Sequence, residues 1–426
     1  MPQQDNSMRW QQRCDIALFW LVPVFLLVDG LNGAILQFFG VNPGLSVGYK
    51  LTVLLLMLIS LGYKQAKLVI AFAVALLCLL AGPAMLWHSM SLHWIRADVQ
   101  LAIKALSPLI AFSYLCLLSQ REPLACLRLC KNTLYFSALL MLINTLAGLA
   151  GLGFHAYQPL DGVAQSFLGI KGFFYSTNEL SAVLLVLCCA VLSSCWRQHK
   201  ALYLLCSAMF IIIAALLLTK TGLFGVTTFI VLIPLLLQPT LFWQRNTKTL
   251  MLIASGLIFV ALSVWLNAEY LLRMLGMYDK LQFVYQQRGI SGILLSSRDY
   301  YANQIWQVAT QHYADGQRLL GVGQGGIAVY LKKYFAEMDW FDLTVFHGLA
   351  GLAVFIVSFA VFFRVGLQTR HSGAGRCLLL LNVLLLLVSS IAGHILTSGM
   401  LWLPWALCNA LLLVVAQQEC KTMELR

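Results

Sequence analysis

Ionisable side chains that interrupt apolar segments are the first residues of this sequence that could do chemistry. Asp29 interrupts the segment LVDGLNG, and Lys104 interrupts a later apolar run. Glu179 and Lys220 each stand at the beginning of another apolar run. A charge inside a membrane is costly, so such side chains are expected to face a cavity within the protein. Four further charges could line the same outward-facing cavity: Lys50, Lys171, Arg298 and Glu337.

Some of these residues also have a purely structural interpretation. Asp29 and Lys104 could form an internal ion pair that neutralises both charges and fixes helix register. His394 falls inside a predicted span, where a hydrogen-bonded packing role is the alternative to a proton relay. At the level of sequence these interpretations and a ligand site both remain open.

Three carboxylates fall close together in the segment EMDWFD, at Glu337, Asp339 and Asp342. Repulsion between close carboxylates can raise the pKa of one of them. A raised pKa would suit a group that takes up a proton during catalysis. The alternative is a solvated turn that precedes a membrane helix.

A cationic cavity with a carboxylate at its rim suits an anionic lipid headgroup such as a polyprenyl diphosphate. Lysine and arginine side chains would stabilise the negative charge that builds up on a departing diphosphate. The carboxylate would take the proton from an attacking sugar hydroxyl. Because basic side chains supply the positive charge, we expect no metal ion and no other cofactor.

The composition shows what must position these residues. Of the 426 residues, 60% are apolar and only 10% are charged, and the mean hydropathy is +0.82. A globular domain carries about 25% charged residues. The composition therefore excludes a soluble enzyme, a nucleic-acid-binding domain and a disordered chain.

A helix that crosses a bilayer needs about 20 mostly apolar residues, and this length divides the chain into twelve predicted spans. They are 16–39, 47–62, 68–86, 99–118, 133–151, 179–194, 202–218, 222–237, 250–266, 344–363, 377–396 and 399–415. We therefore predict an all-α, polytopic membrane protein that forms one membrane domain over residues 1–426.

The distribution of basic residues predicts the orientation of the chain. Most of them fall in the segments that lie inside if the N-terminus is cytoplasmic, as the positive-inside rule requires. An even number of spans then places both termini in the cytoplasm. The net charge of +12 is explained by this topology, so we expect no nucleic-acid partner.

Two outer segments are long enough to hold structure of their own. Residues 267–343 form a large outer loop, in which SSRDYYANQIWQVATQHYADG has the apolar spacing of a helix lying along the membrane surface. The glycines of GVGQGG then predict a tight turn, with a plain helix stop and a phosphate-binding loop as the alternatives. A smaller outer loop covers 152–178.

Several of these segments together resemble the superfamily of O-antigen polymerases and O-antigen ligases of the bacterial envelope. The resembling segments occur in order between residues 169 and 351: GIKGFFYSTNEL, LLTKTGLFG, SSRDYY, GVGQGG and EMDWFDLTVFHGLAG. The arrangement of twelve spans with one large loop is also similar. The resemblance implies transfer of a glycan from undecaprenyl diphosphate to an acceptor hydroxyl on the periplasmic face of the inner membrane, without a metal.

The resemblance also implies roles for individual residues. Ligases carry an arginine before the eighth span, where this chain has Lys220, and a second arginine early in the large loop, here Arg298. Lys171 and Lys104 would assist these two in binding the diphosphate. The ligase histidine, about eleven residues before the glycine that begins the next helix, is replaced by Glu337. We therefore expect Glu337, or Asp339, to be the base, with Asp29, Glu179, Asp342 and His347 as further residues of the pocket.

The replacement favours a polymerase, which joins lipid-linked repeat units of O-antigen or capsule. A ligase that transfers the polymer to lipid A–core is the first alternative, with His347 as a possible base. A transporter or flippase is the second, although no half-to-half repeat is visible. The expected partners are the undecaprenyl-diphosphate-linked glycan, the lipid bilayer and a chain-length regulator.

Overall fold

A computed structural model describes residues 2–157, 168–238, 242, 246–267, 269–270, 273 and 278–424. This part of the chain is almost entirely α-helical, which confirms the predicted fold class. The first helices lie over the first predicted spans: α1 (Pro2–Leu21), the 3-10 turn η1 (Val22–Val24), α2 (Phe25–Phe39), α3 (Leu45–Leu86), the 3-10 turn η2 (Trp87–Ser89), α4 (Leu92–Arg121) and α5 (Pro123–Leu149). Helix α3 contains a kink, because the backbone at Gln65 is non-helical (φ −131°, ψ 49°). The kink divides α3 between the predicted spans 47–62 and 68–86.

The chain then forms a short antiparallel hairpin of β1 (Phe154–His155) and β2 (Ile170–Gly172), which the all-α prediction did not include. Four apolar helices follow: α6 (Thr177–Gln198), α7 (Lys200–Leu217), α8 (Lys220–Leu236) and α10 (Thr247–Leu266). The large loop contributes α12 (Tyr278–Leu294), α13 (Arg298–His312), α14 (Asp315–Leu320) and α15 (Gly323–Ala328). The last helices are α16 (Asp339–Gln368), α17 (Gly373–Ile391) and α18 (Trp402–Glu424).

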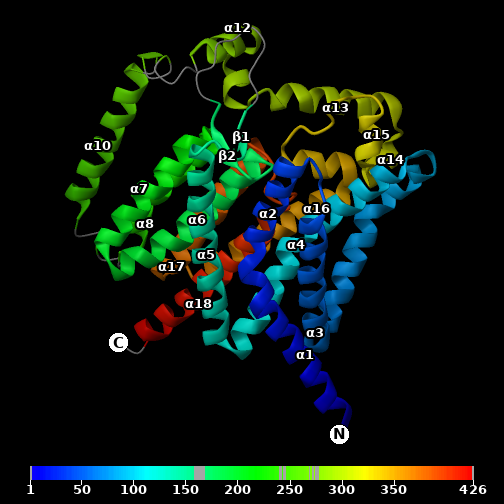
Figure 1. Cartoon of the computed structure of the whole chain (residues 1–426), viewed down its shortest axis with the longest axis horizontal. Coiled ribbons are helices and arrows are strands. Elements are labelled where there is room, and N and C mark those ends of the chain that lie inside the picture. Colours follow the sequence, from blue (N-terminus) through cyan, green and yellow to red (C-terminus); the bar gives the residue numbers. More distant parts are fainter. Residues whose placement is uncertain are drawn as a thin grey trace.

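Eight helical segments of the described chain are long and apolar enough to cross a membrane, and each of the twelve predicted spans overlaps a helix. The hairpin, α13 and α15 lie at one end of the molecule, whereas the start of α1 and the end of α18 lie toward the other (Figure 1). One boundary is corrected. Because α17 ends at Ile391, His394 lies beyond the eleventh helix and not inside it.

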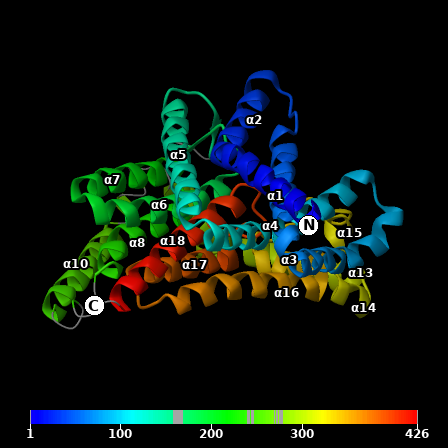
Figure 2. The same ribbon diagram turned by 90° about the horizontal axis from the view of Figure 1, so that it is seen from below.

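Helix α18 lies in the middle of the helical bundle, against α4, α5, α6 and α17 (Figures 1 and 2). Its Trp405 is fully buried and donates a hydrogen bond to Asn382 Oδ1 of α17 at 2.8 Å. The Asn382 amide in turn donates to Asn409 of α18 at 2.8 Å. Buried polar groups that satisfy each other in this way fix the register of two apolar helices, and so fix the loop between them.

Helix α13 confirms the helix predicted in the large loop. Its apolar residues Ile305 and Ala309 are buried in a cluster with Val345 and Phe346 of α16, so this face packs on protein. The GVGQGG turn is also present, since Gly321 and Gly323 have φ values of 99° and 67°. The turn ends α14 and begins α15.

Candidate functional site

The segment before α6 is held by a buried side chain of α5. Asn144 donates to the carbonyl of Lys171 at 3.1 Å and accepts from the backbone N–H of Phe173 at 2.8 Å. Gly172 between them has a φ of 61°, and a Cβ at this position would collide with the Asn144 amide. This clamp fixes where α6 begins and thereby positions Asn178 and Glu179.

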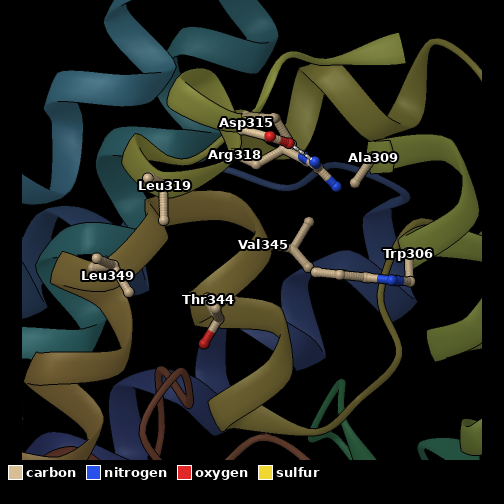
Figure 3. A pocket seen from close by; sticks show the side chains of 9 residues that line it. Trp306, Ala309, Asp315, Arg318, Leu319, Thr344, Val345 and Leu349 are labelled. Carbon is tan, nitrogen blue, oxygen red and sulfur yellow. Dashed lines mark hydrogen bonds and ion pairs between the residues drawn. The ribbon is translucent and has the colours of Figure 1, made fainter. Parts of the chain in front are cut away.

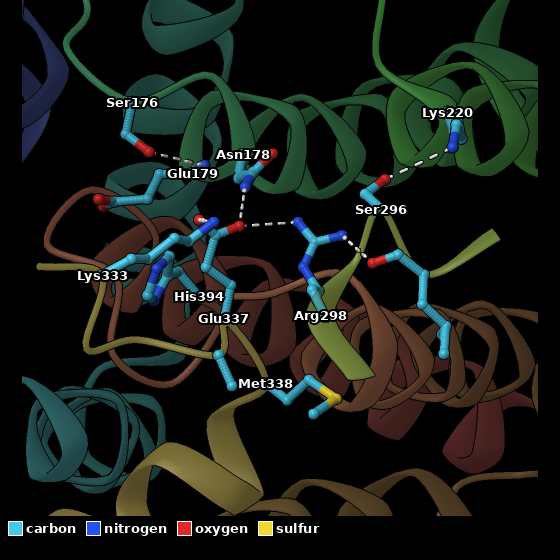
Figure 4. Close-up of polar contacts among 12 residues, drawn as sticks. Ser176, Asn178, Glu179, Lys220, Ser296, Arg298, Lys333, Glu337, Met338 and His394 are labelled. Carbon is cyan, nitrogen blue, oxygen red and sulfur yellow. Dashed lines mark hydrogen bonds and ion pairs between the residues drawn. The ribbon is translucent and has the colours of Figure 1, made fainter. Parts of the chain in front are cut away.

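Glu337 is the centre of a polar cluster that we call the Glu337 cluster, made of Glu337, Arg298, Lys333, Asn178, Lys220 and Ser296 (Figure 4). The Arg298 guanidinium donates to Glu337 Oε2 at 2.9 Å, and the Asn178 amide donates to the same oxygen at 3.3 Å. Lys333 Nζ lies 3.5 Å from Oε1. Burial acts to raise the pKa of the Glu337 carboxyl, but Lys333, Arg298 and His394 outweigh it, so this pKa is lowered.

Arg298 is ready to bind a further anion. It is 8% exposed, and its Nε is buried without a hydrogen-bond partner. A buried donor left without an acceptor costs free energy, so an oxygen-rich anion that reached this atom would be stabilised.

The backbone of Glu337 is strained and is held by Asp342. Glu337 has a φ of 63°, which is costly for a residue with a side chain. The Asp342 carboxylate accepts from the N–H groups of Ala336 and Glu337 at 2.9 Å and of Met338 at 3.2 Å. Asp342 was expected to be a pocket residue. It is only 1% exposed, so it supports the backbone at Glu337 from the protein interior and does not face a pocket.

Asp339 is also buried in the protein interior next to the Glu337 cluster. It is 0% exposed, and its carboxylate accepts from the N–H groups of Ile395 and Leu396 at 2.7 and 2.9 Å and from Thr397 Oγ1 at 2.8 Å. These bonds hold the loop after α17, in which His394 Nδ1 lies 3.0 Å from Thr397 Oγ1. With its oxygens occupied, Asp339 is poorly placed to be the base.

Several parts of the Glu337 cluster lie where helices begin. Lys220 is the first residue of α8 and reaches Ser296 Oγ at 3.5 Å. Arg298 is the first residue of α13, and Asn178 lies in the first turn of α6. Helix N-termini carry partial positive charge and unpaired N–H groups that favour anions, so the helix dipoles add to the side-chain charges.

Backbone strain concentrates in the same place. In the described part of the chain, the non-glycine residues with positive φ are Leu218, Ser296, Ser297, Glu337 and His394. Ser296 and Glu337 belong to the Glu337 cluster, and His394 lies near Glu337 (Figure 4). Ser297 directly precedes Arg298, and Leu218 precedes Lys220 by two residues. Strained conformations persist only where the surrounding structure enforces them, and they gather at functional sites.

A separate cavity of about 870 Å³ lies between α2, α3, α4 and the start of α18. We call it the α2–α4 cavity. Asp29, Lys50, Lys104 and Glu179 line it, whereas Arg298, Lys220 and Glu337 do not. The expected single cavity is therefore divided into two regions. The proposed pair of Asp29 with Lys104 is also corrected, since Asp29 pairs with Lys50 at 2.6 Å.

Two other predicted residues lie outside the Glu337 cluster. Lys171 donates to the carbonyl of Tyr175 at 2.9 Å, and burial lowers the pKa of its ammonium group. His347 is fully buried and its Nδ1 lies 2.8 Å from the carbonyl of Leu79. This histidine stabilises the contact between α16 and α3 and does not face either region.

A smaller hollow of about 350 Å³ lies among α13, α14 and α16 (Figure 3). Its lining is mainly apolar, from residues such as Trp306 and Leu349. Its two charged residues, Asp315 and Arg318, pair with each other. This hollow therefore offers a diphosphate far less than the Glu337 cluster does.

Sequence reasoning missed Asn178 and Lys333. Asn178 directly precedes Glu179 in GIKGFFYSTNEL, so the motif itself was the available signal. Lys333 lies four residues before Glu337, a spacing at which side chains of a turn can meet. His394 was noted only as a residue inside a span, because its position near Glu337 depends on where α17 ends.

Comparison with known proteins identifies the family. A comparison with curated proteins gave no significant match. The family described as O-antigen ligase like membrane protein matches residues 35–272, more than half of the chain. This stretch includes Asn178 and Lys220 and ends before Arg298 and Glu337. The chain therefore belongs to the O-antigen ligase-like family of membrane proteins, multi-pass proteins of the inner membrane that process O-antigen and related polysaccharides.

Proposed function

We propose that this protein is a metal-independent polymerase of undecaprenyl-diphosphate-linked repeat units, acting on the periplasmic face of the inner membrane. The observation that carries the proposal is the contact of Glu337 with Arg298 at 2.9 Å. It places a carboxylate, where related ligases have a histidine, directly beside a cation with an unpaired donor. Together they supply a proton acceptor and an anion site for one reaction.

Arg298 and Lys220 bind the diphosphate of the growing chain in this proposal. The side chains act together with the N-termini of α8 and α13, which favour anions. Arg298 now pairs with Glu337, so an arriving diphosphate would compete for the guanidinium. That exchange would release Glu337 to face the acceptor hydroxyl at the moment when the donor is bound.

The transfer itself moves one bond and one proton. The hydroxyl oxygen of the incoming repeat unit bonds to the anomeric carbon at the reducing end of the growing chain. The bond from this carbon to the diphosphate oxygen breaks, and its electron pair leaves with undecaprenyl diphosphate. Glu337 takes the hydroxyl proton, and its lowered pKa keeps it ionised at neutral pH, the form that accepts a proton.

A ligase that transfers the polymer to lipid A–core is the second candidate, and the family match is compatible with either activity. Its donor site would be the same, and only the acceptor would differ. Partnership with a chain-length regulator and a cytoplasmic position of both termini belong to the proposal in either case.

The decisive experiment uses purified protein and lipid-linked repeat units as the only glycan, with the products separated on a gel. A ladder of oligomers is expected. Transfer that occurs only after lipid A–core is added would replace the polymerase by the ligase. No transfer under either condition would overturn both and leave transport as the function to test.

A further inference from the structure

The α2–α4 cavity contains hydrogen-bond acceptors that the protein leaves unsatisfied. Asp29 is nine-tenths buried, and only one of its oxygens is bonded, to Lys50 and Ser46. Asp29 Oδ2 and Asn32 Oδ1 are both buried without a partner, and both residues line the cavity. They are three residues apart on α2, so they share one face of the helix. A ligand that satisfies them must donate hydrogen bonds.

The cavity has more anions for its cations than the Glu337 cluster, since Asp29 and Glu179 stand against Lys50, Lys104 and Arg96. Lys50 is neutralised by Asp29 at 2.6 Å, and Lys104 attracts Glu179. The ammonium groups of Lys50 and Lys104 flank Gly399, where a Cβ would lie 3.7 and 3.8 Å from their nitrogens. A diphosphate offers only acceptors, so it would leave Asp29 Oδ2 and Asn32 Oδ1 unsatisfied and would bring its negative charge near two carboxylates. A neutral ligand rich in hydroxyl groups does.

The cavity adjoins the Glu337 cluster through two segments of backbone. Glu179 lines the cavity, and the preceding residue, Asn178, donates to Glu337. The loop that supplies Gly399 to the cavity also brings Gly393 against Glu337, since a Cβ on Gly393 would lie 2.9 Å from the Glu337 carbonyl oxygen. A molecule in the cavity could therefore extend a hydroxyl toward the Glu337 carboxylate.

We propose that the α2–α4 cavity is the binding site for the sugar of the acceptor, which donates its hydroxyl groups to Asp29 and Asn32. This inference rests on the proposed transfer reaction and adds to it the place and the chemistry of the acceptor site. The size agrees, because ligand pockets occupy about 300–1,000 Å³. Lys104 then belongs to the sugar site and not to the diphosphate site.

Two probes separate this site from the diphosphate site. The first is the free oligosaccharide released from lipid-linked repeat units by mild acid, which lacks both lipid and diphosphate. The second is inorganic diphosphate. Binding of each is measured by calorimetry on the full-length protein in detergent, for the native protein and for Asn32→Ala, Asp29→Asn and Arg298→Ala. Gly30→Ala is the matched control on α2, because a Cβ there meets nothing within 4 Å.

Asn32→Ala is expected to weaken oligosaccharide binding by about threefold to tenfold, the loss of one hydrogen bond. Asp29→Asn should weaken it at least as much, and neither should change diphosphate binding. Arg298→Ala should do the reverse, and Gly30→Ala should change neither. Asn32→Ala removes no ion pair, so it stays informative if Asp29→Asn fails to fold.

Absence of oligosaccharide binding by the native protein, or equal binding by Asn32→Ala, would overturn the acceptor site while leaving the polymerase proposal standing. Weaker diphosphate binding in both α2 variants would instead make the cavity part of the donor site. The polymerase proposal fails separately, if the native protein forms no ladder of oligomers.

Discussion

The Glu337 cluster and the α2–α4 cavity differ in the kind of buried polar atom that has no hydrogen-bond partner. In the cluster the unpaired buried atom is a donor, Arg298 Nε, whereas in the cavity the unpaired atoms are acceptors, on Asp29 and Asn32. In the cluster two cations, Arg298 and Lys333, contact one carboxylate, and a third, Lys220, contacts Ser296 (Figure 4). In the cavity two carboxylates, Asp29 and Glu179, share the lining with the cations, and Asp29 forms an ion pair with Lys50. The two regions are thus complementary to different chemical groups.

This difference shows why total charge was a poor guide to the site. Counted together, the ionisable residues make one cationic cavity suited to a diphosphate. Sorted by hydrogen bonds, they make one site for an anion and one for a hydroxyl-bearing ligand, separated by the first turn of α6. Two sites side by side are what a reaction between two glycans requires.

The largest expected effect comes from the carboxylate of the cluster. Glu337→Gln keeps the size of the side chain but cannot take up a proton, so the transfer rate should fall by about 10²- to 10⁴-fold. The rate of ladder formation at saturating substrate measures this. His347→Ala is the control, because His347 contacts Leu79 and not the cluster. This variant should lower the transfer rate far less than Glu337→Gln does. The opposite ranking would support a histidine mechanism of the ligase type.

Arg298→Ala should lower the transfer rate by about 10²- to 10³-fold, the range for removing one donor to a developing anion. Arg298→Lys should restore part of the rate, because it keeps the charge and loses the paired geometry of the guanidinium. Each variant is assayed for ladder formation after its elution from size-exclusion chromatography shows that it is folded. Normal polymer from Arg298→Ala would contradict the diphosphate site.

The fold class could be predicted from the sequence because it depends on composition averaged over the whole chain. The family could be predicted because it depends on the order of motifs along the chain. The sequence also predicted the helix at Arg298–His312, since apolar spacing is a local property. The β1–β2 hairpin was not predicted, because its strands are only two and three residues long, too short for an alternating pattern to be visible.

The division of the charges into two regions could not have been predicted from the sequence. From the sequence, Lys50 and Lys104 are both possible ion-pair partners of Asp29. Lys50 forms the pair because α2 packs against α3. Asp339 and Asp342 have the same residue type, yet each is directed to a different set of N–H groups. Such choices depend on atoms brought together by the whole fold.

Asp342→Asn should have a smaller effect, through the backbone of Glu337. Asparagine retains one carbonyl oxygen where Asp342 now accepts three N–H bonds with two oxygens, so the turn at Glu337 loses support. We expect the transfer rate to fall by about tenfold, with diphosphate binding unchanged, because Arg298 is held separately by α13. A loss of diphosphate binding together with transfer would show that Asp342 supports the whole cluster and not the position of Glu337.

Lys333→Met tests the electrostatics of the cluster and should have the smallest effect. Burial acts to raise the pKa of Glu337, and among the charges that oppose this and lower it, Lys333 ranks before Arg298 and His394. Removing this cation should therefore raise that pKa. Because the ionised carboxylate accepts the proton, transfer is lost as the pH falls through the pKa, so the acid limb of the pH–rate profile should move to higher pH. Lys332→Met removes the same charge from the exposed neighbouring residue and should leave the limb in place. Equal shifts in both variants would mean that the limb reports the overall charge of the loop and not Glu337.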